Sequence, residues 1–126
     1  MKRRAAREKA FQILFQMDMN DIAPQEAIEH VLEHDLHDSH LTQLVHGVTE
    51  QRKEIDARIA EHLENWRIDR LPSVEKALLR IATYEMFYDI DTPHGVAINE
   101  AVEIANRYGE EKSGKFINGV LSKMTK

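Results

Sequence analysis

The most apolar stretch of the chain is Leu71-Pro-Ser-Val-Glu-Lys-Ala-Leu-Leu-Arg-Ile-Ala-Thr-Tyr-Glu-Met-Phe-Tyr88. Pro72 suits the first turn of a helix, and neither glycine nor proline interrupts the stretch after it. On a helix, the apolar side chains would cover two sides and leave only a narrow polar strip. A helix with two apolar sides needs packing partners on both. The stretch therefore predicts a central helix that the other helices cover.

One charged residue interrupts an apolar side of this predicted helix. Glu85 shares that side with Leu78, Ile81 and Tyr88, so we expect its carboxylate to be buried. A buried carboxylate needs hydrogen-bond donors, and the N-terminus of a neighbouring helix would supply them. We expect no histidine or second buried carboxylate close enough to form a catalytic pair with Glu85. Glu85 is therefore interpreted as a structural residue that ties two helices together.

The length and composition of the chain narrow its class. At 126 residues it has the size of one domain, and we expect a single helical domain over residues 1–126. The absence of cysteine excludes disulfides, thiolate metal sites and a cysteine nucleophile. No apolar run approaches the roughly 20 residues of a membrane span, and no apolar segment follows the basic N-terminus as in a signal peptide. We therefore expect a soluble, cytoplasmic protein with no membrane partner.

Charge is distributed unevenly along the chain. The net charge is −5, but residues 1–17 hold five basic residues and one acidic residue. Residues 18–64 hold twelve acidic and three basic residues, and residues 65–126 hold nine of each. The overall acidity therefore conceals a basic end, through which the protein could bind nucleic acid.

The basic end is predicted to be a helix over residues 3–17, because apolar residues recur in it every three or four positions. Arg4, Arg7, Phe11 and Phe15 lie on one flank beside this apolar stripe. Arginines contact phosphates and exposed rings offer stacking surfaces to unpaired bases, so the flank is a candidate surface for single-stranded RNA. The alternative is that both rings widen the buried side. Burial is favoured for Phe11, and both roles stay open for Phe15.

Helical periodicity continues through the rest of the chain. It predicts a short helix at 24–34, a long or kinked helical region at 39–64 with a candidate break at 53–56, a helix at 98–108 that ends at Gly109, and a last helix at 116–124. Gly47 is costly inside a helix, so we expect it to permit the close approach of a neighbour. No region alternates like a strand. The predicted fold class is all-α, with six or seven helices.

Sequence patterns that would indicate an enzyme or a cofactor are absent. The chain has no phosphate-binding loop, dinucleotide fingerprint, zinc-protease motif or serine-nucleophile motif. A group of histidines has spacings that resemble those of metal ligands. However, the group lies in a polar connection, and a predicted helix start at 38–39 interrupts the helical spacing of the histidines. We therefore expect no metal site in this group, which comprises His30, His34, His37 and His40.

Three stretches together resemble the NusB family of bacterial transcription antitermination factors. They are Val74-Glu-Lys-Ala-Leu-Leu-Arg-Ile-Ala-Thr-Tyr-Glu-Met86, Val96-Ala-Ile-Asn-Glu-Ala-Val-Glu-Ile-Ala-Asn-Arg-Tyr-Gly109 and Lys115-Phe-Ile-Asn-Gly-Val-Leu121. Their order and spacing, with the basic N-terminal helix, extend the resemblance over nearly the whole chain. The resemblance implies an all-α fold of two small bundles around a shared core, and no enzymatic activity.

The resemblance also implies partners and site residues. Members of the family bind the boxA element of ribosomal RNA leader transcripts, usually with the ribosomal protein NusE, and help RNA polymerase read through terminators. By position, the implied RNA contacts are Arg3, Arg4, Arg7, Phe15, Lys115 and Phe116, and the implied residues on the NusE side are Glu75 and Arg80. Phe15 stands where relatives often have tyrosine, and Lys112 stands where some have an acid. The rival hypothesis is a helical protein–protein interaction module that does not bind RNA.

Overall fold

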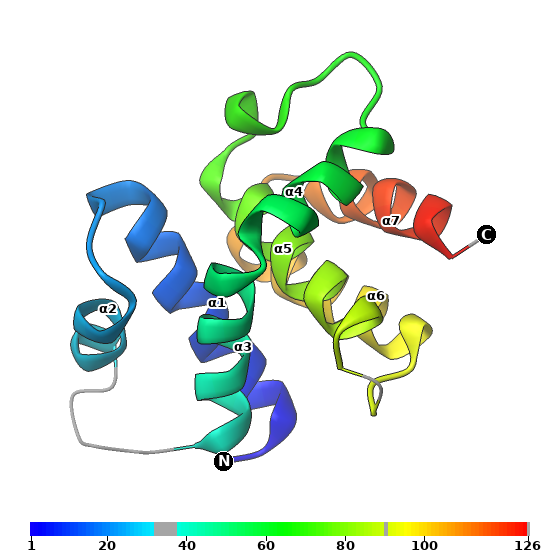
Figure 1. Ribbon diagram of the computed structural model, residues 1–126. Helices are drawn as coiled ribbons and strands as arrows, with labels where there is room; N and C mark the ends of the chain where they lie inside the picture. Colours follow the sequence, from blue (N-terminus) through cyan, green and yellow to red (C-terminus); the bar gives the residue numbers. More distant parts are fainter. Residues whose placement is uncertain (32–37, 90, 126) are drawn as a thin grey trace.

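The computed structural model describes residues 1–31, 38–89 and 91–125. All regular secondary structure in these residues is helical, which confirms the predicted all-α class (Figure 1). Seven α-helices and one short 3₁₀-helix are formed in the described residues: α1 (Arg3–Asn20), α2 (Pro24–Val31), α3 (Ser39–Glu50), α4 (Arg52–Glu61), η1 (Ile68–Arg70), α5 (Ser73–Phe87), α6 (His94–Tyr108) and α7 (Ser113–Met124).

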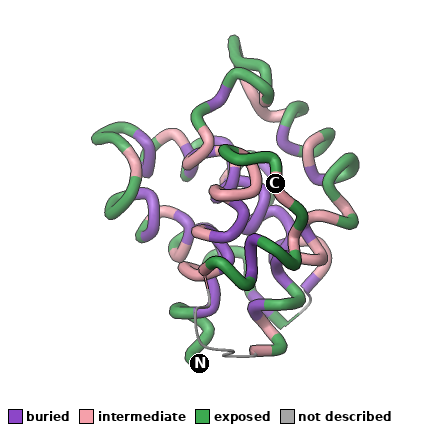
Figure 2. Tube along the Cα trace, turned by 90° about the vertical axis from the view of Figure 1, so that its left-hand side faces the viewer, coloured by how far each residue is buried: buried purple, intermediate pink, exposed green. Residues whose placement is uncertain are grey.

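Helix α5 is the central element of the fold, as its two apolar sides predict. It packs against α1 and α3 from one bundle and against α4, α6 and α7 from the other (Figure 1). Eleven of its fifteen residues are buried, and Leu78 and Leu79 have no exposed surface. Burying a side chain of this size stabilises the fold by about 1.5–3 kcal/mol. Figure 2 shows the buried residues concentrated along the inner segments of the trace.

The two bundles are built from different pairings around α5. In the first bundle, α1 packs against both α2 and α3. In the second, α6 packs against α7, and both also contact α5. None of the helices among the described residues is long and apolar enough to cross a membrane.

Gly47 permits the close approach that the sequence predicts. A Cβ atom built on Gly47 would lie 2.3 Å from Cε1 of Tyr84 on α5, closer than any real contact allows. The Tyr84 ring is 7% exposed, and Gln43 on α3 donates to its hydroxyl at 3.3 Å. The absent side chain at Gly47 therefore sets the distance between α3 and α5.

Several helix bounds differ from the sequence prediction. The region at 39–64 is two helices separated at Gln51, so the candidate break at 53–56 is wrong. Gln51 leaves helical geometry with φ −100° and ψ 15°, although its N–H still donates to Gly47 O at 3.0 Å. The last two helices begin earlier than predicted, at His94 and Ser113. Residues 32–34 of the predicted second helix lie outside the described residues.

Candidate nucleic-acid interface

Arg3 and Arg4 lie at the exposed N-terminus of α1. The Arg4 side chain is 69% exposed, and its Nε donates to both carboxylate oxygens of Glu100 at 3.2 Å. The Arg3 side chain is 55% exposed, with its Nη1 3.8 Å from Asp89 Oδ2. Water and salt screen both guanidinium groups, whereas the Asp89 and Glu100 carboxylates are only 8% and 13% exposed. Either guanidinium is therefore accessible to a phosphate.

Polar side chains join α1 to α6 along a line that we call the α1–α6 seam. Beyond the contact between Arg4 and Glu100, Arg107 Nη1 lies 2.6 Å from Glu8 Oε1. Farther along, Gln12 Nε2 donates to the Tyr108 hydroxyl at 3.1 Å. These contacts advance in the same direction along both helices. The seam comprises Arg4, Glu8, Gln12, Glu100, Arg107 and Tyr108.

The seam ends at a surface groove of about 320 Å³, which we call the α1 groove. Phe15 is half-buried and lines this groove, whereas Phe11 beneath it is 2% exposed, which confirms the predicted burial of Phe11. The centroid of the Phe11 ring lies 6.0 Å from that of the Phe15 ring and 5.1 Å from that of the Tyr108 ring. Phe15 therefore packs on the core with one side and borders solvent with the other. The groove is lined by Phe11, Gln12, Phe15, Gln16, Val31, Val74 and Tyr108.

A second groove, of about 240 Å³, lies where the connection between α4 and α5 meets the start of α7. We call it the Trp66 groove; it is lined by Trp66, Leu71, Pro72, Glu75, Glu110, Lys112, Ser113 and Phe116. Phe116 is half-buried against the core, and Lys115 beside it is exposed. The start of α7 therefore presents a cation beside a ring, as the sequence predicts.

The two grooves are neighbours. Val74 lines the α1 groove, and the next residue, Glu75, lines the Trp66 groove. Likewise, Tyr108 borders the first groove and Glu110 borders the second, on either side of Gly109. The two grooves therefore lie beside each other at the start of α5 and at the end of α6.

The family model described as NusB family matches residues 4–126 of the chain. The chain belongs to the NusB family. It is 54% identical over 122 residues to the transcription antitermination protein NusB of Bacillus subtilis strain 168, covering 97% of this chain and 93% of that protein. It is 53% identical over 122 residues to the Bacillus velezensis protein of the same name, covering 97% of this chain and 94% of that protein.

Solved structures of NusB proteins have the same fold. The structure of T. maritima NusB superimposes with a TM-score of 0.89 at 37% sequence identity, covering 98% of this chain and 90% of that chain. A structure of the antitermination factors NusB and NusE in complex with dsRNA matches with a TM-score of 0.87 at 32% identity, covering 97% of this chain and 94% of that chain.

In this NusB-family chain, Arg7 does not lie on the exposed cationic flank where the sequence analysis put it. Its side chain is 6% exposed, and its Nε donates to both carboxylate oxygens of Glu85 at 2.9 Å. Its Nη1 also lies 3.3 Å from Glu100 Oε1. Placing Arg7 in solvent was wrong because the buried Glu85 carboxylate needs a cation, and Arg7 on α1 is the one that reaches it.

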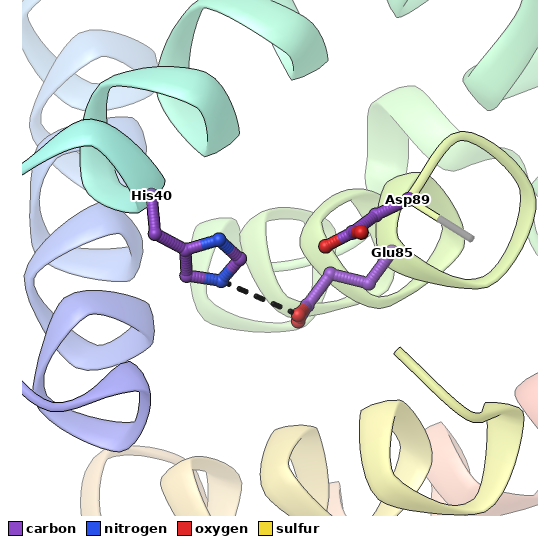
Figure 3. Close-up of side chains that lie close together, drawn as sticks. All are labelled: His40, Glu85 and Asp89. Atoms are coloured by element: carbon purple, nitrogen blue, oxygen red, sulfur yellow. Dashed lines mark ion pairs between the residues drawn. The ribbon is translucent and has the colours of Figure 1, made fainter. Parts of the chain in front are cut away.

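Glu85 ties helices together, as predicted, but its surroundings differ from the prediction. Its main donor is the Arg7 side chain and not the backbone of a helix N-terminus. The expectation that no histidine or second buried carboxylate lies nearby was wrong, because His40 from α3 and Asp89 both approach Glu85 (Figure 3). His40 Nε2 is 3.7 Å from Glu85 Oε2, and Thr92 Oγ1 donates to Asp89 at 3.0 Å.

The group of His40, Glu85 and Asp89 has the residue types of a metal site. Each residue offers one ligand atom, and these atoms lie within 4.8 Å of one another. However, Arg7 already contacts both oxygens of Glu85. The guanidinium supplies the positive charge that a metal ion would otherwise bring, so we interpret the group as a structural junction of α1, α3 and α5. Of the other histidines in the candidate metal group, His30 is exposed on α2, and His34 and His37 lie outside the described residues.

The side chains of Glu75 and Arg80, which the resemblance assigns to the NusE side, are largely buried. Arg80 is 8% exposed and donates to both oxygens of Asp56, at 2.8 and 3.0 Å. Glu75 is 7% exposed and accepts a hydrogen bond from Ser113 Oγ at 2.6 Å. Each of these two side chains satisfies a polar group inside the fold, and their assignment to the NusE side stays a prediction.

The predicted RNA residues do not all lie at the surface, because Arg7 is buried whereas the others are at least partly exposed; these are Arg3, Arg4, Phe15, Lys115 and Phe116. Helices α1 and α7 both pack on α5, but α6 contacts them both and makes the bridge between them. Sequence reasoning overlooked Arg107, Tyr108 and Trp66 as surface residues. Trp66 had a usable signal, because it is the only tryptophan in the sequence and stands in the short connection between two predicted helices.

Proposed function

We propose that this chain is a transcription antitermination factor that binds RNA along the α1–α6 seam and the two grooves. Its membership of the NusB family and its identity of about half with antitermination proteins support the activity. A relative has been solved with NusE and dsRNA, which favours an RNA-binding role over the rival hypothesis of a protein-only interaction module. The partners we propose are boxA-like RNA, NusE and the RNA polymerase antitermination complex. A factor that acts on transcripts would work in the cytoplasm.

The observation that carries the location is the line of exposed cations and rings on this surface. Arg3 and Arg4 stand at one end, and Lys112, Lys115 and Phe116 stand at the other. Arg107, half-exposed, lies between them with Tyr108, which is 44% exposed. Cations that contact phosphates beside rings that can stack on bases are typical of surfaces for unpaired RNA.

The same surface predicts that RNA affinity is modest without a partner. Glu100 and Glu8 form ion pairs with Arg4 and Arg107, so an RNA phosphate that binds either arginine must displace a carboxylate. These carboxylates hold the cations in position but reduce the local positive potential. A partner protein that adds RNA contacts would therefore raise affinity more than the seam does alone.

The test is the salt dependence of RNA binding. Fluorescence anisotropy would measure the affinity for a labelled boxA-like single strand over a range of salt concentrations. The double variant Arg3→Ala/Arg4→Ala should weaken binding and flatten the slope of log K against log salt by about 1.4, because each lost phosphate contact removes about 0.7.

The matched control variant removes the same number of positive charges at a place away from the proposed RNA surface. Arg52 and Lys53 are exposed on α4, away from the seam, and Arg52→Ala/Lys53→Ala should leave the slope unchanged. An Arg3→Ala/Arg4→Ala protein that stays folded and binds with the wild-type slope would show that the RNA surface lies elsewhere.

A further inference from the structure

We propose that the Trp66 groove binds one unpaired nucleobase of the RNA, and that Glu75 selects a base bearing an exocyclic amino group. This inference rests on the proposed function and assigns a specific subsite to it. The occupant follows from the rings, the carboxylate and the cations that meet at this groove.

Trp66 supplies the first argument. It lies in the connection between α4 and α5 and is 55% exposed, which is unusual for the largest aromatic side chain. Phe116 from α7 lines the same groove and is anchored against the core on its inner side. Two rings bordering one groove provide stacking surfaces, and stacking is the interaction that every nucleobase can make.

The size of the groove supports a single base. Its volume of about 240 Å³ is below the roughly 300–1,000 Å³ of typical small-molecule sites. Leu71 and Pro72 contribute apolar surface to its lining, and Glu75 and Ser113 contribute polar atoms. A flat ring with a polar edge fits a groove whose lining is partly apolar and partly polar.

Glu75 supplies the selectivity. Ser113 Oγ donates to its Oε1 at 2.6 Å, and the backbone N–H of Glu110 donates to Ser113 Oγ at 2.9 Å. These bonds orient the carboxylate, and no described hydrogen bond occupies Oε2. An ionised carboxylate only accepts hydrogen bonds, so it favours base edges that carry amino groups. Guanine, cytosine and adenine have such an amino group, and uracil does not.

Charge at the rim suits the phosphates on either side of such a base. Lys112 lines the groove and Lys115 lies one turn farther along α7, and both are exposed. Neither lysine forms an ion pair with the other residues that the structure describes. The groove also lies beside the α1 groove, because Val74 and Glu75 are adjacent on α5.

The experiment uses Trp66 as its own reporter, because the chain has no other tryptophan. The whole 126-residue chain is titrated with four short, labelled, U-rich single strands. Three of them carry one central C, A or G, and the fourth is U throughout. Anisotropy of the label measures binding, and the intrinsic fluorescence of Trp66 measures occupation of the groove. We expect strands with an amino-bearing base to quench Trp66 and to bind more tightly than the all-U strand.

Variants separate stacking from base selection. Trp66→Ala, at an exposed position, should fold and lose on the order of 10-fold in affinity. Met19→Ala removes another exposed apolar side chain outside both grooves and should bind as the wild type does. Glu75→Gln keeps an oxygen for Ser113 but adds donors, so it should reduce the preference for amino-bearing bases over uracil.

The outcomes distinguish this inference from the proposed function. RNA binding without any change in Trp66 fluorescence, and with wild-type affinity in Trp66→Ala, would overturn the base subsite while leaving the RNA surface intact. Equal binding of all four strands would overturn the role of Glu75. A fluorescence change caused by NusE alone would identify a protein as the occupant. No RNA binding at all would overturn the proposed function and the subsite with it.

Discussion

The ion pair between Arg7 and Glu85 should be a main determinant of stability in this protein. The two side chains are 6% and 1% exposed, and both oxygens of Glu85 accept from Arg7 Nε at 2.9 Å. Removing one member strands a buried charge, which typically costs about 3–5 kcal/mol. A domain of this size has a free energy of unfolding of about 5–15 kcal/mol. Arg7→Met and Glu85→Leu should therefore each lower it by a large fraction.

A double-mutant cycle tests this reasoning. Replacing both residues leaves no stranded charge between them, so Arg7→Met/Glu85→Leu should cost less than the sum of the single changes, with a coupling energy of about 1–3 kcal/mol. Urea unfolding followed by far-UV circular dichroism is the appropriate assay. Trp66 is 55% exposed and so would report unfolding poorly.

The control is the exposed ion pair between Glu8 and Arg107, whose side chains are 26% and 50% exposed. Glu8→Ala should cost less than about 1 kcal/mol. If Arg7→Met instead keeps wild-type stability and loses RNA affinity, Arg7 acts on the RNA surface and its assignment to the interior is wrong. Additive single changes, within about 0.5 kcal/mol, would refute the coupling.

Two further predictions concern the helices themselves. Gly47→Ala should destabilise the protein by about 1–3 kcal/mol, because the new Cβ would meet the Tyr84 ring at 2.3 Å. The control is Gly119→Ala in α7, where a Cβ meets nothing within 4 Å; it should stabilise the protein by about 0.5–1 kcal/mol. If the two variants change the melting temperature equally, the close packing of α3 on α5 at Gly47 is contradicted. Asp38 caps α3, and the hydrogen bond that its carboxylate accepts from Leu41 N–H at 3.0 Å lowers the pKa of Asp38 from its ordinary value of 3.8. The stabilisation of the fold by this carboxylate should therefore be complete above pH 3.8 and should disappear as the pH falls through the lowered pKa. Asp38→Ala should lose about 0.5–2 kcal/mol near neutral pH and little in acid, whereas a pH-independent loss would show that the charge of Asp38 contributes nothing.

Much of the candidate interface could be predicted from the sequence, because exposure at a chain end is a local property. Arg3 and Arg4 are exposed at the start of α1, and Lys115 stands beside a half-buried Phe116 at the start of α7, as expected. Arg7 could not be assigned in this way. Whether an arginine beside an apolar stripe turns outward or inward depends on whether the packed fold places a carboxylate within its reach.

By itself, the sequence determined which sides of the helices are buried. The two apolar sides of residues 71–88 required a central helix, and Gly47 required a close neighbour, because helical periodicity is written in nearby residues. Tertiary structure alone decided which groups meet. Arg7 and Glu85 are 78 positions apart, and Trp66, Glu75 and Phe116 come together only when the α4–α5 connection and α7 pack against the start of α5. No local pattern records these distances, since the partner of a buried charge and the walls of a groove are set by how helices cross in space.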